Sequence, residues 1–197
     1  MKKVKRKIKK INDAYHYIFD AQDEIRKLLQ EGNQGEALKT VTISFAVDFL
    51  LPKVREILIR DKRIDSCGFL FKITERGIMR KCVDLCPLQL NAQEKKEYLH
   101  NMATSEGAHA LIHCTDSWYL DVPVPGIKPS ESPDRKEAIH IRLSFPTGVG
   151  FIWQHHYQRQ QDGSIILDRL VDLYPYGISN EVMERFAKEH AIPEGNA

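Results

Sequence analysis

Hydrophobic and polar residues alternate most regularly over residues 137–174, and this stretch predicts a three-stranded meander. In its first strand the apolar side chains occupy every second position, as in a half-buried strand: Ile139, Ile141, Leu143 and Phe145. A turn over 146–148, which contains Pro and Gly, leads into a second alternating run over 149–160. Asp162-Gly163 favours a hairpin turn into a third strand, 164–174, which Pro175 is expected to end.

Three earlier strands are predicted upstream of the meander. Residues 67–74 and 78–85 alternate on either side of a Gly-containing turn, which is typical of a hairpin. Asn91, with Glu94 three residues later, favours a helix N-terminus with a capping box. The chain then returns to strand over 109–121. Because short loops join neighbouring strands, we expect mainly antiparallel pairing.

Residues 36–61 are predicted to be mostly helical, because the apolar stretch is long for a strand. Thr40–Val47 also alternates like a strand and is rich in β-branched residues, so this alternative stays open. Pro52 is expected either to kink the helix or to lie in the first turn of a second helix, 53–63.

Residues 3–30 carry a heptad pattern that predicts a long amphipathic N-terminal helix. Its seam has one polar member: Val4, Ile8, Ile11, Tyr15, Ile18, Gln22, Ile25 and Leu29. The seam either packs on the body of the protein or pairs with a second copy to form a homo-oligomer. We therefore predict a helical arm over 1–31 and, after the turn at 32–35, a single domain over 36–192 that ends in a helix at 180–190.

These elements predict an α+β fold: a mainly antiparallel sheet of about six strands, with helices on one face and the long amphipathic helix at the N-terminus. The 42% of hydrophobic residues is enough for a core in a chain of 197 residues. No apolar run approaches the length of a membrane span, and no apolar segment follows the basic start of the sequence. Four scattered cysteines favour a reducing compartment, so we expect a cytoplasmic protein without membrane contact.

Positive charge is concentrated in the first ten residues, which hold seven basic side chains and no acid: Lys2, Lys3, Lys5, Arg6, Lys7, Lys9 and Lys10. The rest of the chain has 22 basic and 27 acidic residues, a balance of −5, although the whole chain has a net charge of +2. Clustered cations attract the phosphates of nucleic acids without sequence specificity. The alternative is that the basic segment only aids solubility.

Several segments occur in an order that resembles a group of uncharacterised bacterial and phage proteins. They are Leu58–Lys62, the hairpin over 67–85, His113–Trp118 and Ser130–Ala138. In that group a strand ends in a Ser-Glu-Ala-Trp-like segment, and a Ser-x-x-Pro-x-Arg-x-Glu loop precedes the next strand. This chain differs at Asp116, where the group has Glu, and at Lys62, where it has Gly. The resemblance covers residues 54–143 and implies fold boundaries but no activity.

One candidate ligand-binding site lies at the strand ends that flank the Pro-rich loop 122–135. Asp116, Trp118, Arg135 and Glu137 combine an acid, an aromatic ring and an Arg–Glu pair beside that loop. The alternative is structural: Arg135 pairs with Asp116 or Glu137 to hold the loop, and Trp118 covers the core.

The candidates for catalysis lie on the last hairpin and the strand before it. Asp168 and Asp172 are expected to approach His156 across the last hairpin, and His140 shares the polar face. The sequence has no nucleophile elbow, phosphate loop or dinucleotide fingerprint, so no cofactor is predicted. Its histidines and cysteines lack metal-ligand spacing, so no metal site is predicted.

We therefore predict a cytoplasmic, non-catalytic interaction protein whose basic N-terminal helix binds a partner or nucleic acid. The alternative is a small hydrolase-like enzyme or ligand-binding protein, with its site beside the Pro-rich loop or at the histidines. The two alternatives differ in geometry, because a binding site requires these polar residues to line one concave pocket.

Overall fold

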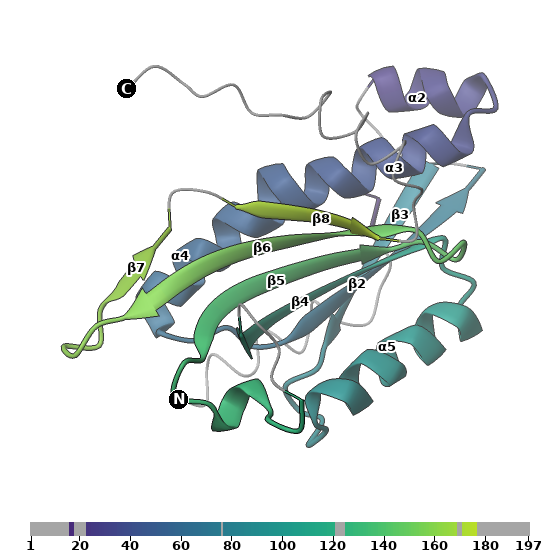
Figure 1. The fold of residues 1–197 in the computed structure, drawn as a ribbon. Coiled ribbons are helices and arrows are strands. Elements are labelled where there is room, and N and C mark those ends of the chain that lie inside the picture. The colour runs from purple at the N-terminus through teal and green to yellow at the C-terminus, as the bar shows by residue number, and fades with distance from the viewer. Residues whose placement is uncertain (1–15, 18–22, 76, 121–124, 169–170, 177–197) are drawn as a thin grey trace, which may run out of the picture.

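The described part of the chain forms one curled antiparallel sheet with helices on both sides (Figure 1). The computed structural model describes residues 16–17, 23–75, 77–120, 125–168 and 171–176. The strands lie in the order β1-β3-β2-β4-β5-β6-β7, and β8 also pairs with β6. Their bounds are β1 His16–Tyr17, β2 Cys67–Thr74, β3 Gly77–Asp84, β4 Ala110–Tyr119, β5 Lys136–Ser144, β6 Gly150–Arg159, β7 Ile165–Leu167 and β8 Asp172–Tyr176.

The α+β class and the antiparallel sheet are confirmed, and all six predicted strands are present. The last predicted strand is divided into β7 and β8, which both pair with β6. The prediction that Pro175 ends this strand is wrong, because Pro175 lies inside β8 opposite Phe151. Since β8 is at the edge of the sheet, a residue without an N–H is tolerated there.

The prediction of one helix over residues 3–30 is wrong at His16–Tyr17. These two residues form β1 and pair with Arg80 and Met79 of β3. The backbone N–H and C=O groups on the outer edge of β3 need partners, and β1 supplies some of them. Helix α2 spans only Asp23–Gln30, and its Leu28 and Leu29 pack against the core. The rest of the heptad seam, including its possible pairing with a second copy, lies outside the described residues, as does the helix predicted at 180–190.

The helical segment predicted for 36–61 is confirmed, and the strand alternative for Thr40–Val47 is wrong. It comprises α3 (Gln34–Ser44), a π-helical turn (Phe45–Leu50) and α4 (Leu51–Asp61), with Pro52 in the first turn of α4. One buried side chain occurs at every fourth position: Leu38, Thr42, Ala46, Leu50, Val54 and Leu58. Steps of four residues drift around an ideal α-helix of 3.6 residues per turn. The wider π-helical turn offsets part of this drift and keeps the row against the sheet.

The main core lies between this helical segment and one face of the sheet. The Phe45 ring lies 5.0 Å from the Phe69 ring and 5.5 Å from the Phe71 ring, both in edge-on geometry. Apolar residues of β4, β5 and β6 complete the core, among them Ile112, Ile139, Ile141, Leu143 and Trp153.

Helix α5 (Ala92–Ser105) lies on the opposite face, so the prediction that helices cover one face is wrong in this respect (Figure 1). The predicted capping box at Asn91 and Glu94 is confirmed. Leu99 of α5 packs with Leu70 and Leu111, whose side chains alternate with those of the main core. Residues of β2, β3 and β4 supply this smaller cluster, and on the same face β5 and β6 carry mainly polar side chains.

Candidate functional site

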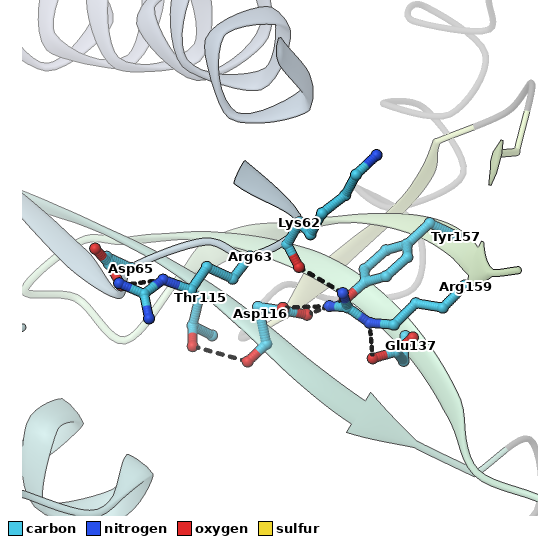
Figure 2. A network of polar contacts seen from close by, with 8 residues as sticks. All are labelled: Lys62, Arg63, Asp65, Thr115, Asp116, Glu137, Tyr157 and Arg159. Carbon is cyan, nitrogen blue, oxygen red and sulfur yellow. Dashed lines mark hydrogen bonds and ion pairs between the residues drawn. The ribbon is translucent and has the colours of Figure 1, made fainter. Parts of the chain in front are cut away.

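Figure 2 shows a polar network centred on Arg159 at the end of β6. Arg159 Nε donates to Glu137 Oε1 at 2.8 Å, and Nη2 donates to the Tyr157 hydroxyl at 3.0 Å. Its Nη1 donates to the backbone carbonyl of Lys62, which follows α4. The Tyr157 hydroxyl in turn donates to Asp116 Oδ1 at 2.6 Å. The network therefore joins β4, β5 and β6 to the end of α4.

Electrostatics agree with a structural role for this network. Burial raises the pKa of Asp116, while the hydrogen bond from Tyr157 and the charge of Arg159 oppose the rise. Burial and the hydrogen bond to Asp116 raise the pKa of Tyr157, so its hydroxyl remains a donor at neutral pH. Because each guanidinium nitrogen of Arg159 already donates to a partner, the network offers little hydrogen-bonding capacity to a ligand.

Arg135 and Trp118 lie beside this network but form a separate contact. The predicted pairing of Arg135 with Asp116 or Glu137 is wrong, because Arg159 occupies that position. The Arg135 guanidinium stacks 5.1 Å from the centre of the Trp118 ring, and its Nη1 donates to the Ser130 carbonyl at 2.9 Å. The sequence contained a signal for Arg159, since it continues the alternation of Trp153 and Tyr157 on the same face of the strand.

The predicted histidine cluster is formed in part. His156 Nε2 lies 2.7 Å from Asp172 Oδ2, as expected. No hydrogen bond joins the side chain of Asp168 to His156; instead the Asp168 carbonyl lies 2.8 Å from Nε2 of His155, on the opposite face. His140 Nδ1 lies 3.2 Å from Ser117 Oγ.

A polar pocket of about 880 Å³ collects four of the seven predicted ligand-binding and catalytic residues: Arg135, Glu137, His156 and Asp168. Asp116, Trp118 and His140 are not among its lining residues. Most of its charged groups are already paired, for example Glu137 with Arg159 and His156 with Asp172. Paired charges leave few polar groups available to a ligand.

A second cavity, which the sequence did not indicate, lies between α5 and the sheet. This α5 groove has a volume of about 840 Å³. Its apolar lining includes Leu99, Ala103, Ala110, Leu111 and Phe145, and its polar lining includes Lys96, Glu97, His100, His113, Arg142, Ser144 and Tyr176. A largely apolar cavity with a few convergent polar groups is the usual form of a small-molecule site.

Arg142 is the central polar residue of the α5 groove. Its guanidinium lies 4.5 Å from the centre of the Tyr176 ring, and Nε donates to the Tyr176 hydroxyl at 3.3 Å. That hydroxyl donates to the Leu143 carbonyl at 2.7 Å and lies 2.6 Å from Ser144 Oγ. Within the described residues, Arg142 forms no ion pair with a carboxylate. Among the residues that the structure describes, its position is therefore fixed by neutral groups.

Tyr176 reaches this position because Gly150 has no side chain. Gly150 pairs with Tyr176 in the β6–β8 ladder. A Cβ at Gly150 would lie 2.1 Å from the Leu143 carbonyl oxygen and 2.3 Å from the Tyr176 hydroxyl, both impossibly close. The glycine therefore permits the contact that orients Arg142.

His113 forms part of the groove wall and is uncharged at neutral pH. Its Nε2 lies 3.0 Å from Ser66 Oγ. Burial lowers the pKa of His113 to about 4, and the positive charges of Arg142, Lys95 and Lys96 contribute to the shift. The groove is lined by two cationic side chains, Lys96 and Arg142, and this balance favours anions. One acid, Glu97, also lines the groove and accepts a hydrogen bond from Gln93.

Within the described ranges, no group of three or more His, Cys, Asp or Glu side chains is arranged to hold a metal ion. The thiols of Cys67 and Cys114 face each other across β2 and β4, and their hydrogen bond and burial raise the pKa of Cys67. The predicted nucleic-acid-binding residues, Lys2 to Lys10, lie outside the described part of the chain.

Among the described residues, no helix is both long enough and apolar enough to cross a membrane. No protein-family model, curated protein or solved structure matches this chain. The resemblance of residues 54–143 to uncharacterised bacterial and phage proteins stays a prediction.

Of the two cavities, the α5 groove is the candidate site that the geometry favours, because it joins an apolar lining to a few convergent polar groups.

Proposed function

We propose that this chain is a non-catalytic binding protein for a small molecule that joins one anionic group to an apolar body, held in the α5 groove. This follows the ligand-binding alternative from the sequence but places the site on the other face of the sheet. The observation that carries the proposal is Arg142, an arginine in a largely apolar groove that has no carboxylate partner among the described residues.

The geometry of Arg142 suits a carboxylate. Nε is engaged by Tyr176, which leaves the two terminal nitrogens to donate in parallel to two oxygens of one anion. Stacking on the Tyr176 ring restricts the guanidinium before a ligand arrives, which reduces the entropic cost of binding. Leu99, Leu111 and Phe145 supply apolar surface for the rest of the molecule.

A binding role is favoured over a catalytic one because the described residues that line the groove form no nucleophile–base pair. Ser144 Oγ lies 2.6 Å from the Tyr176 hydroxyl rather than beside an imidazole. His113, the half-buried imidazole of the groove, is engaged by Ser66.

The test uses anilinonaphthalene sulfonate, a fluorescent anion with an apolar body, followed by competition with phenylbutyrate. We expect saturable fluorescence enhancement that phenylbutyrate reverses and the uncharged phenylbutyramide does not. Arg142→Met should weaken binding roughly 10- to 100-fold, the effect of losing a hydrogen-bonded charge. Arg142→Lys keeps the positive charge but loses the two parallel donors of the guanidinium, so its affinity should lie between those of the wild type and Arg142→Met.

Arg63→Met is the matched control, since Arg63 is exposed and pairs only loosely with Asp65 at 3.8 Å. Its affinity should equal that of the wild type. Circular dichroism establishes that each variant is folded, because this dye also binds partly unfolded protein. Equal affinities of folded Arg142→Met and wild type, or displacement by the amide as readily as by the acid, would reject the proposal.

A further inference from the structure

Two histidines on the polar face of the sheet have ring nitrogens without a partner among the described residues. His140 lies on β5 and His156 on β6, and His156 is the cross-strand partner of Ala138. The two histidines are therefore diagonal neighbours on one face, with Cβ atoms roughly 7 Å apart, within reach of two imidazoles. His140 Nε2 and His156 Nδ1 are both buried and have no hydrogen-bond partner in the part of the chain that the structure describes.

The other nitrogen of each ring is held from the outer side of this strand pair. Ser117, on β4, lies 3.2 Å from His140 Nδ1, and Asp172, on β8, lies 2.7 Å from His156 Nε2. Strand β4 flanks β5 and β8 flanks β6, so both contacts point away from the space between the histidines. Since the two nitrogens of an imidazole point to nearly opposite sides, these contacts leave the unpartnered ones available on the inner side. The Tyr119 ring of β4 also packs 4.8 Å from the His156 ring.

The tautomer of His156 follows from its partner. A carboxylate only accepts, so the contact with Asp172 places a proton on His156 Nε2, and in the neutral imidazole Nδ1 then presents a lone pair. An imidazole that donates one N–H to a carboxylate and presents the other nitrogen is the usual arrangement of a metal-binding histidine.

We propose that His140 Nε2 and His156 Nδ1 together bind one divalent transition-metal ion of the class that prefers imidazole, such as Zn²⁺, Ni²⁺ or Cu²⁺. His156 and Asp172 line the polar pocket of about 880 Å³ and His140 does not, so the ion enters from the side of His156, with water as its further ligands. The site is independent of the α5 groove. His155 provides a contrast: its Nδ1 is also unpartnered, but the ring is fully buried in the core face.

The experiment titrates the full chain with Zn²⁺, Ni²⁺, Cu²⁺ and Mg²⁺ by isothermal calorimetry. A Cys86→Ser background removes the exposed thiol as a competing ligand. We expect one site, tighter for Cu²⁺ than for Ni²⁺ and undetectable for Mg²⁺. His140→Gln and His156→Gln should each weaken binding at least about 10-fold, and Asp172→Asn should weaken it about 10-fold through the orientation of His156.

His109→Gln is the matched control. His109 is exposed and directly precedes β4, so its substitution should leave the metal affinity unchanged. A second measurement uses the chain with both histidines intact, so it does not depend on whether the variants fold. Long-range nitrogen NMR should show Zn²⁺ shifting His140 Nε2 and His156 Nδ1. The proposal would be overturned if these shifts were absent, or if the two rings still shared a proton by a direct hydrogen bond in excess Zn²⁺. Equal metal affinities of the folded variants and the control would also overturn it.

Discussion

The hydroxyl of Tyr157 on β6 donates a 2.6 Å hydrogen bond to Asp116 on β4, across the intervening strand β5. Both side chains face the main core, where a carboxylate without a partner is costly. This contact and those of Arg159 connect three strands by side chains in addition to their backbone ladders.

Tyr157→Phe should therefore destabilise the fold by about 1–3 kcal/mol, because it leaves a half-buried carboxylate with one donor fewer. Urea denaturation monitored by circular dichroism measures the change. Tyr98→Phe is the control, since Tyr98 is 37% exposed, and its effect should stay within about 0.5 kcal/mol. Equal midpoints for the two variants would show that the hydrogen bond contributes little.

Gly150→Ala should be strongly destabilising, by about 3 kcal/mol or more, because the added methyl group meets both the Leu143 backbone and Tyr176. It should also weaken binding of the dye in the α5 groove, since Tyr176 orients Arg142. Gly35→Ala lies in α3 with open space around it and should stabilise the protein by about 0.5–1 kcal/mol. Thermal melts compare the two, and a neutral Gly150→Ala would contradict the close packing.

Lys62→Gly should raise stability by about 0.5–1 kcal/mol. Lys62 has a φ of +60°, the left-handed conformation that usually ends a helix at glycine and is costly for other residues. Its carbonyl contact with Arg159 does not require the side chain. Lys53→Gly, within α4, should instead lower stability by about 1 kcal/mol. Urea midpoints that move in the same direction would contradict this distinction.

Stability should fall as the pH is lowered from about 6.5 towards 4. The folded pKa of His113 is about 4, below its ordinary value of 6.5, so between these values the unfolded chain binds more protons. The stabilising contribution is present above 6.5 and lost towards 4, and it is at most about 3 kcal/mol because solvent partly screens the ring. His113→Gln should make the urea midpoint depend less on pH between 6.5 and 4, whereas His109→Gln should leave this dependence unchanged.

The first ten residues are expected to give weak, salt-dependent binding to nucleic acid without sequence preference. Fluorescence anisotropy with labelled duplex DNA and single-stranded RNA tests this at low and physiological salt. A chain that begins at Ile11 lacks the seven basic residues but keeps β1 and should not bind. Equal binding by both chains would place any nucleic-acid site in the body of the protein.

The strands were predictable because each alternates apolar and polar residues and ends in recognisable turn residues. The capping box at Asn91 was likewise a local signal. Local sequence could not reveal that α5 packs on the second face, because Leu70 and Leu111 look like ordinary apolar neighbours of Phe69 and Ile112. Local sequence also could not distinguish β1 from part of a helix, because β1 is defined by the long-range pairing of His16 with Arg80.

The candidate sites were predictable only in part. Asp116 and Glu137 were identified, but their partner Arg159 lies more than 20 residues away in sequence from either. The α5 groove was missed because Arg142, Gly150 and Tyr176 come from three strands and one helix covers them. Alternation places Arg142 on a polar face, yet nothing local shows that it has no carboxylate partner within the described ranges.

The π-helical turn Phe45–Leu50 has a consequence for how the length of this protein can vary. It sets the rotation of α4 relative to α3, so deleting one residue there would turn Val54 and Leu58 by about 100° away from the sheet. Surface loops tolerate insertions and deletions far more readily, because no buried row depends on their residue count. Related sequences should therefore differ in length at the loops while conserving the number of residues between Leu38 and Leu58, even where the side chains between them change.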